Sequence, residues 1–346
     1  MKIAKKNFGM LSEGKKARLF ILRAGDLELV MTNYGASLVA LYVPASQRPR
    51  EDVLLGYGTL SGYAADRFFF GSTIGRYANR IAGGTFTLNG RTYVLDKNSG
   101  NHTLHGGRRG FSHRLWKADS YEEKDGVFVR FEISSPDGDG GFPGRLKAAV
   151  SYGLSKSNEL IVDYSAEVDK PCPVSLSNHA YFNLSGEGRG DILSHEALFY
   201  ASRYVALGGE CIPTGALPGV EGGPFDLRTR TVIKDAMARS PEIAGGFDHC
   251  FAADGESGKL RPFAELSDPL SRRKMRLFST HPGFQFYTGN SITATAGKPG
   301  SFYEKHSGFC LEPQFFPDTP NQTAFPPCVY SPERKFHERS LYSFDW

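Results

Sequence analysis

Alternation of apolar and polar side chains along much of the chain is the feature that most constrains its fold. Apolar residues occupy every second position in residues 127–133, 146–154 and 160–168, and a turn-rich stretch, residues 136–144, separates the first two segments. Residues 27–31 alternate in the same way. A two-residue period places successive side chains on opposite faces of an extended strand. These segments are therefore predicted to be half-buried β-strands joined by turns.

Turn signals and the scarcity of helical patterns extend this prediction to the rest of the chain. Asn89-Gly90 stands between two short alternating stretches, residues 86–88 and 93–95, and is the strongest short-range signal for a β-hairpin. The best helical candidate, Val232 to Ala238, covers about two turns at most. The 40 glycines and 20 prolines also indicate many turns. We therefore predict an all-β, antiparallel architecture with few short helices.

Charge and composition restrict the class of protein further. The formal net charge is only +4 over 346 residues, and no run of Lys and Arg stands out, so a nucleic-acid partner is not expected. No linker, charge run, internal repeat or low-complexity segment marks a boundary. Residues 1–346 are accordingly predicted to form a single domain.

The cysteines and the apolar runs bear on the compartment. The five cysteines are odd in number, widely spaced and without a Cys-x-x-Cys pair, which argues against a disulfide framework and against a zinc site; they are Cys172, Cys211, Cys250, Cys310 and Cys328. Residues 1–7 lack the apolar core of a signal peptide, and no apolar run reaches membrane-spanning length. A cytoplasmic protein without a membrane partner is expected.

Chemistry is suggested by charged or titratable residues that stand alone in uncharged segments. Glu312 is the one carboxylate in residues 309–314, and His105 and His179 lie in similarly uncharged stretches. A buried Glu is costly unless something uses it. A carboxylate and imidazoles brought together from distant segments would form a general acid/base site that needs neither a metal nor a nucleophile.

Several of these residues also have a purely structural interpretation. His105 could be a turn histidine before Gly106-Gly107, and its pairing with His102 as metal ligands fits a Gly-rich loop poorly. His179 could be a hydrogen-bonded core histidine, or its ring could be oriented by Asn178.

Three further segments carry polar candidates. Asn79-Arg80 offers an amide and a guanidinium to a polyhydroxyl ligand, although Arg76 and Arg80 could equally be surface ion-pair partners. Asp248 follows two glycines and could cap its own turn. Gln285 lies among aromatic residues and could bond either a hydroxyl group or the backbone.

Taken in order, these segments resemble a known family. The shared blocks are residues 75–81, 104–107, 178–184, 246–249, 285–290 and 311–312. They resemble the aldose 1-epimerase (galactose mutarotase) family, and the resemblance runs from about residue 8 to the end of the chain. The chain departs from the usual family pattern at His281, Pro313 and Phe315, which leaves the preferred hexose open.

The resemblance implies a fold, a reaction and roles for individual residues. It implies a large single-domain β-supersandwich with an open sugar cleft, and interconversion of the α and β anomers of free hexoses such as glucose and galactose without a cofactor or a metal. Glu312 is implied as the general base and His179 as the general acid. The implied sugar-binding residues are Asn79, Arg80, His105, Asp248 and Gln285, with Tyr181 as a wall of the site.

Two other functions remain open from the residues alone. One is a sugar-binding or regulatory module without catalysis on the same scaffold, although pure binding does not require the Glu312 and His179 pair. The other is a glycoside hydrolase that uses Glu312 and Asp248 as paired carboxylates. The sequence leaves open whether the protein is a monomer or a dimer.

Overall fold

The alternating segments form the strands of a nine-stranded sheet and two five-stranded sheets. The computed structural model describes residues 1–46 and 48–346. Every named strand pair in this part of the chain is antiparallel. In spatial order the nine-stranded sheet contains β11 (Lys117–Glu123), β12 (Gly126–Ser135), β13 (Leu146–Ser155), β14 (Glu159–Val168), β29 (Phe336–Asp345), β23 (Lys274–Ser279), β22 (Arg261–Ser267), β18 (Glu196–Phe199) and β20 (Thr231–Val232).

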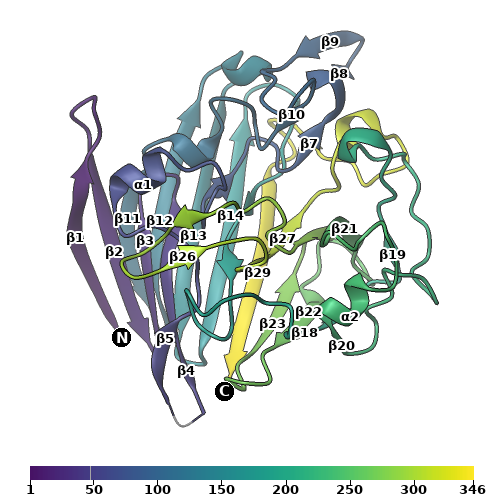
Figure 1. Cartoon of the computed structure of the whole chain (residues 1–346). Coiled ribbons are helices and arrows are strands. Elements are labelled where there is room, and N and C mark those ends of the chain that lie inside the picture. The colour runs from purple at the N-terminus through teal and green to yellow at the C-terminus, as the bar shows by residue number, and fades with distance from the viewer. Residues whose placement is uncertain (47) are drawn as a thin grey trace.

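The two five-stranded sheets come from the two ends of the chain. The N-terminal sheet contains, in order, β1 (Lys2–Met10), β2 (Lys16–Ala24), β3 (Leu27–Thr32), β4 (Ser37–Ala45) and β5 (Arg48–Asp52). The second sheet contains β17 (Tyr181–Phe182), β27 (Phe309–Gln314), β24 (Gly283–Tyr287), β21 (Asp248–Ala252) and β19 (Arg203–Tyr204). Figure 1 shows the N-terminal sheet in purple on one side of the molecule and the second sheet in green and yellow on the other.

Short pairs of strands and two short helices complete the described structure. The pairs are β7 (Arg80–Ile81) with β10 (Thr103–Leu104), β6 (Thr73–Ile74) with β16 (Ser177–Asn178), β8 (Thr85–Leu88) with β9 (Arg91–Val94), β15 (Cys172–Pro173) with β28 (Val329–Tyr330), and β25 (Thr295–Ala296) with β26 (Phe302–Tyr303). The helices are α1 (Leu60–Ala64) and α2 (Ile233–Met237). Neither of these helices is long and apolar enough to span a membrane, nor is any other helix in the described ranges.

The predicted elements are confirmed in type and close to their expected positions. The three long alternating segments are β12, β13 and β14, which pair in sequence order. Asn89 and Gly90 both have positive φ, 51° and 75°, in a two-residue turn that pairs Leu88 with Arg91. This is the backbone geometry that Asn-Gly hairpins require.

The prediction that β13 is half-buried is wrong. Its residues from Ala148 to Ser155 are buried on both faces. Small residues occupy its outer face, and a Cβ atom added to Gly153 would lie 2.2 Å from the Phe128 ring of the neighbouring strand. Large side chains on the flanking strands therefore cover positions that alternation alone assigns to solvent.

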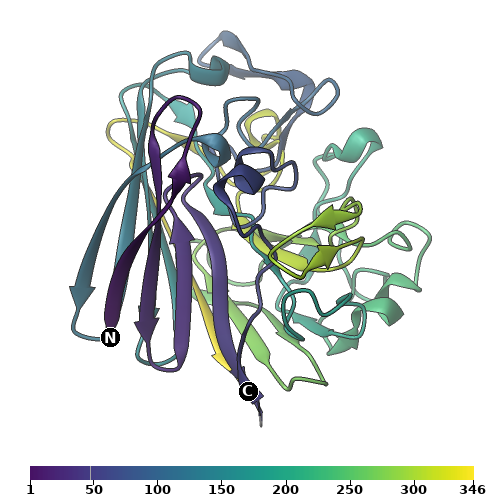
Figure 2. The same ribbon diagram turned by 60° about the vertical axis from the view of Figure 1, so that its left-hand side comes forward.

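Both five-stranded sheets pack on the same face of the nine-stranded sheet. Phe131, Val150 and Tyr164 are successive cross-strand partners and so point to one side. On that side Phe131 packs edge-on against Phe20 of β2, with ring centroids 5.5 Å apart. Further along the sheet, Tyr342 of β29 donates a hydrogen bond of 3.2 Å to the carbonyl of Leu311 in β27. Figure 2 shows this layering from a second direction.

Candidate active site

All eight residues that the sequence singled out line one cleft of about 330 Å³. They come from six separate stretches of the chain, the shortest connection being between Asn79-Arg80 and His105. The cleft opens above the second five-stranded sheet, and short strand pairs hold the loops around it. The tertiary fold therefore brings the predicted residues together.

Glu312 is placed by the register of three neighbouring strands. Gln285 of β24 is the direct cross-strand partner of Glu312 in β27, and Asp248 starts β21 on the far side of β24. The Gln285 Nε2 donates a hydrogen bond of 2.6 Å to Asp248 Oδ1. Three polar side chains thus stand side by side on the sheet face that floors the cleft.

His179 lies between the short strands β16 and β17 and faces Glu312. Its backbone N–H donates to the Ser72 carbonyl at 2.9 Å, and its carbonyl accepts from the Gly71 N–H at 3.0 Å. The imidazole Nε2 lies 3.7 Å from Glu312 Oε1. On the other edge of the ring, Nδ1 lies 3.5 Å from Cys310 Sγ. The ring is therefore held with one nitrogen toward the carboxylate.

Asn178 does not orient this ring. Its amide donates to the Gly71 carbonyl at 2.6 Å and to the Tyr152 hydroxyl at 2.8 Å. Successive side chains of a strand point to opposite faces. Asn178 consequently supports the backbone behind the site rather than the imidazole of the next residue.

Asn79, Arg80 and His105 are joined by the β7–β10 pair. The Asn79 N–H donates to His105 Nδ1 at 3.2 Å, so the ring proton of neutral His105 resides on Nε2. The Asn79 side-chain carbonyl accepts from the Arg80 N–H at 2.9 Å. Both Asn79 and His105 have positive φ, 67° and 51°. The segment thus presents a guanidinium and an imidazole N–H to the cleft.

Arg76 is not a surface ion-pair partner, in contrast to one of the two expectations for it. It is buried, and its guanidinium donates to the carbonyls of Ser135, Pro136, Pro143 and Gly144. Backbone carbonyls satisfy this cation in place of a carboxylate. Arg76 therefore ties together two loops of the core, and Arg80 is the guanidinium of this pair that reaches the cleft.

Burial moves the pKa values of the two facing groups in opposite directions. Loss of solvent and the negative charge of Asp248 raise the pKa of Glu312 well above its usual value, against the opposing effect of Arg80. Loss of solvent lowers the pKa of His179 to about 4. Burial, followed by the charges of His179 and Arg80, lowers the pKa of His105 well below its usual value. Both shifts consequently favour the uncharged forms, a neutral imidazole at His179 and a protonated carboxyl group at Glu312.

The same pair is part of a cluster that resembles a metal site in composition. His179, Cys310 and Glu312 each bring one potential ligand atom within 4.8 Å of the other two. Burial and the nearby Glu312 raise the pKa of the Cys310 thiol well above its usual value. A metal binds the thiolate rather than the thiol. We therefore interpret this cluster as a site for proton transfer.

Sequence reasoning missed part of the cleft wall. The additional lining residues are Arg67, Phe68, Phe69, Leu104, Tyr287, Asn290 and Ser291. The loop of residues 67–69 carries no titratable pattern that would single it out. Its one visible signal is the run of three phenylalanines, Phe68 to Phe70, immediately before Gly71.

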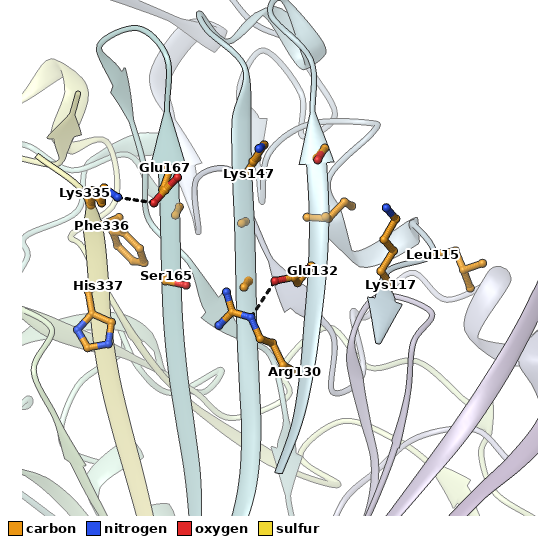
Figure 3. Close-up of a pocket in the computed structure, with 15 residues that line it drawn as sticks. Leu115, Lys117, Arg130, Glu132, Lys147, Ser165, Glu167, Lys335, Phe336 and His337 are labelled. Carbon is orange, nitrogen blue, oxygen red and sulfur yellow. Dashed lines mark hydrogen bonds and ion pairs between the residues drawn. The ribbon is translucent and has the colours of Figure 1, made fainter. Parts of the chain in front are cut away.

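A second hollow, of about 800 Å³, lies on the outer face of the nine-stranded sheet (Figure 3). It is lined by charges of both signs, including ion pairs of Lys335 with Glu167 and of Arg130 with Glu132. None of the eight candidate residues lines it. The candidate catalytic and sugar-binding residues thus lie in the smaller cleft.

Comparison with known proteins agrees with the fold. The family profile described as aldose 1-epimerase matches residues 18–343. The chain is 41% identical to galactose mutarotase of Rattus norvegicus, covering 97% of each chain, and 34% identical to aldose 1-epimerase of Escherichia coli strain K12, covering 96% of each.

Solved structures support the same assignment. A galactose 1-epimerase from Lactobacillus acidophilus has a TM-score of 0.87 at 24% identity, covering 99% of this chain and 98% of that one. An aldose epimerase homologue from C. elegans has a TM-score of 0.86 at 26% identity, covering 94% of this chain and 99% of that one. The profile match over residues 18–343 and the relatives at 41% and 34% identity show that the chain belongs to the aldose 1-epimerase family.

Proposed function

We propose that this protein interconverts the α and β anomers of free hexoses in the cleft that contains Glu312 and His179. The chain is a carbohydrate isomerase by family, with aldose 1-epimerase and galactose mutarotase relatives over nearly its whole length. The observation that carries the site assignment is the distance of 3.7 Å between His179 Nε2 and Glu312 Oε1 inside the cleft. Two proton-transferring groups at this spacing can serve adjacent oxygens of one sugar.

The reaction requires two coordinated proton transfers. Glu312 takes the proton of the C1 hydroxyl, the bond between C1 and the ring oxygen breaks, and His179 protonates that oxygen. The open-chain aldehyde rotates about its C1–C2 bond and closes on the other face, and both protons return. No atom is gained or lost, and no oxidant or reductant is needed. The symmetry of the reaction requires each group to act as acid in one direction and as base in the other.

This sequence starts with Glu312 as the carboxylate and His179 as the protonated imidazole. Burial acts against both of these charged forms, because it raises the pKa of Glu312 and lowers that of His179 to about 4. The positive charge of Arg80 favours the carboxylate form of Glu312, from which the base acts.

We assign the remaining polar groups to holding the hexose. Asp248 and Gln285 are linked by a hydrogen bond and lie on the next two strands after that of Glu312, so they are suited to bind adjacent hydroxyl groups. Arg80 and the Nε2–H of His105 supply donors from the opposite segment. Asn79 holds the Arg80 backbone through its side-chain carbonyl. Tyr181 packs against His179, with ring centroids 5.0 Å apart, and forms a wall of the site.

Polarimetry on freshly dissolved α-D-glucose and α-D-galactose tests the proposal. The protein is expected to accelerate the approach to the equilibrium rotation for at least one of these sugars. Sugar binding by calorimetry without acceleration would support a binding module instead. Release of reducing sugar from a disaccharide would support a hydrolase that uses Glu312 with Asp248.

We also propose that the enzyme works in the cytoplasm. The odd number and wide spacing of its cysteines are typical of a reducing compartment. Fractionation of the source cells with an antibody to the protein would test this, and recovery outside the cytoplasm would contradict it.

A further inference from the structure

Phe69 has a backbone conformation that bulky residues rarely adopt. Its φ is 60°, in the left-handed region that favours glycine. A large side chain with positive φ is an outlier, and such outliers concentrate where function maintains them. Phe69 also lines the cleft that contains Glu312 and His179, and its side chain is half-buried.

Asp66 and the His179 segment hold Phe69 in this conformation. The buried carboxylate of Asp66 accepts hydrogen bonds from the Phe68 N–H at 2.9 Å and the Phe70 N–H at 2.7 Å, on either side of Phe69. The Phe69 carbonyl accepts from the Ser72 N–H at 3.0 Å, and Ser72 in turn accepts from the His179 N–H. The strained residue is therefore fixed from both sides and tied to His179.

The Phe69 ring contacts both imidazoles of the cleft. Its centroid lies 4.8 Å from that of His105, in an edge-to-face arrangement, and 5.9 Å from that of His179. The opposite side of the cleft is polar, with Asp248, Gln285 and Glu312 on the sheet. The cleft thus has one apolar aromatic wall and one wall of hydrogen-bonding groups.

The surface of a pyranose ring is divided in the same way, into apolar and hydrogen-bonding parts. Its hydroxyl groups point mainly outward around the ring, and its axial C–H bonds form an apolar face that packs on aromatic rings. We propose that Phe69 is a substrate-binding residue, whose strained backbone aims the ring at the C–H face of the sugar while the hydroxyl groups meet the polar wall. This inference rests on the proposed function, because it concerns the same cleft and the same free hexose.

Substitutions of Phe69 test the role of the ring. Phe69→Ala is expected to raise KM for the preferred hexose about tenfold or more, with a smaller change in kcat, because it removes one aromatic contact in the bound state. Phe69→Tyr and Phe69→Trp retain an aromatic face and are expected to keep KM within about threefold of wild type. If Phe69 had only a structural role, its substitution by Ala would lower the melting temperature but would not change KM more than kcat.

A second comparison tests the backbone strain. Phe69→Gly and Phe69→Ala both remove the ring, but only glycine adopts positive φ without penalty. Phe69→Gly is therefore expected to melt about 2 °C above Phe69→Ala, the reverse of the usual order in extended or helical backbone. Arg272 is a matched control, because it is exposed, has a φ of 64° and lies outside the cleft lining. Arg272→Gly is expected to melt above Arg272→Ala, with mutarotation unchanged in both.

The outcomes separate this inference from the proposed function. If the wild-type protein does not accelerate mutarotation, the proposed function itself is wrong. If the wild type is active and Phe69→Ala keeps both its KM and its kcat, the substrate-binding role of Phe69 is overturned while the function stands. If the Phe69→Gly variant melts at or below the temperature of the Phe69→Ala variant, the backbone of Phe69 is not strained.

Discussion

Glu312 combines near-complete burial with an oxygen, Oε2, that has no hydrogen-bond partner among the residues that the structure describes. A buried carboxylate is costly unless it is paired, and groups with strongly shifted pKa values concentrate at functional sites. Its neighbour His179 is equally buried and also lacks a charged partner other than Glu312 in that part of the chain. The two residues thus face each other in a buried site, where Asp248 and Arg80 also act on the ionisation of Glu312.

This pairing predicts the pH dependence of the reaction. The active form holds one proton on the pair. Because the pKa of His179 is lowered to about 4, a second proton binds only as the pH falls through about 4, and activity is lost there. Because the pKa of Glu312 is raised, this proton leaves only as the pH rises through that raised value, and activity is lost again. The profile of kcat/KM, which reports the free enzyme, is expected to be a broad bell.

Initial rates measured by polarimetry across the pH range would give this profile. Circular dichroism at each pH would confirm that the protein stays folded. A loss of activity centred near pH 6.5, the ordinary pKa of histidine, would contradict the role of burial in setting the His179 pKa.

At the level of single residues, the sequence singled out eight residues that the fold brings to one cleft, but it did not single out Phe69. Glu312 and His179 were visible because charged or titratable residues are rare inside uncharged stretches. Phe69 was not visible, because phenylalanine is expected in the core and its positive φ depends on hydrogen bonds to Asp66. The departures at His281, Pro313 and Phe315 are buried and lie outside the cleft lining, so they change the support of the site rather than its surface.

At the level of elements, strands β21, β24 and β27 determine where the acidic groups stand. Their aromatic content is visible in the sequence, but their pairing joins residues that are 23 or more positions apart. Register across such distances depends on the packed core and on turn geometry elsewhere. The existence of strands could therefore be predicted, whereas the meeting of Glu312 with Gln285 could not be derived from periodicity.

Another short element, β7, depends on a residue far along the chain. The Asp318 N–H donates to the Arg80 carbonyl at 2.7 Å, and the Asp318 Oδ1 accepts from the Ala82 N–H at 2.9 Å. Asp318 is itself buried and receives the side-chain amides of Asn321 and Gln322. It consequently fixes the backbone on both sides of Ile81, directly after Arg80.

We predict that Asp318→Ala raises KM for the hexose and lowers stability. Removing the buried acceptor leaves the Ala82 N–H without its partner, at a cost of about 1–3 kcal/mol for a buried group that stays unpaired, and takes one acceptor from the amides of Asn321 and Gln322. Chemical denaturation and initial rates would measure the two effects. Asp169→Ala is the control, since Asp169 also accepts a backbone N–H, that of Arg145, but is exposed. Equal effects of the two substitutions on KM would contradict a specific role for Asp318.

At the level of the whole molecule, one continuous hydrophobic cluster includes residues of all three large sheets. Phe20 of the N-terminal sheet, Phe131 of the nine-stranded sheet and Phe286 of the second five-stranded sheet belong to it. A shared core is what a single domain requires. The prediction of one domain over residues 1–346 thus has a physical basis, and we propose it as the unit of folding.

Calorimetry of two core variants would test that proposal. Phe131→Ala and Phe286→Ala lie in different sheets, and each is expected to cost about 3–5 kcal/mol. If the chain unfolds as a single cooperative unit, each substitution lowers the midpoint temperature of the same transition by about 5 °C at this chain length. Splitting into two transitions, with each variant shifting only one, would show that the sheets unfold as separate domains.

The central claim is that Glu312 and His179 act together on one sugar, and a double-mutant cycle measured by NMR exchange between the α and β anomers tests it most directly. Glu312→Gln and His179→Asn are each expected to slow the exchange about 10²–10⁴-fold, since each removes one positioned acid or base. Because the residues act as a unit, the double variant is expected to be no slower than the slower single variant. Near-wild-type exchange in either single variant, or losses that multiply in the double variant, would contradict the account.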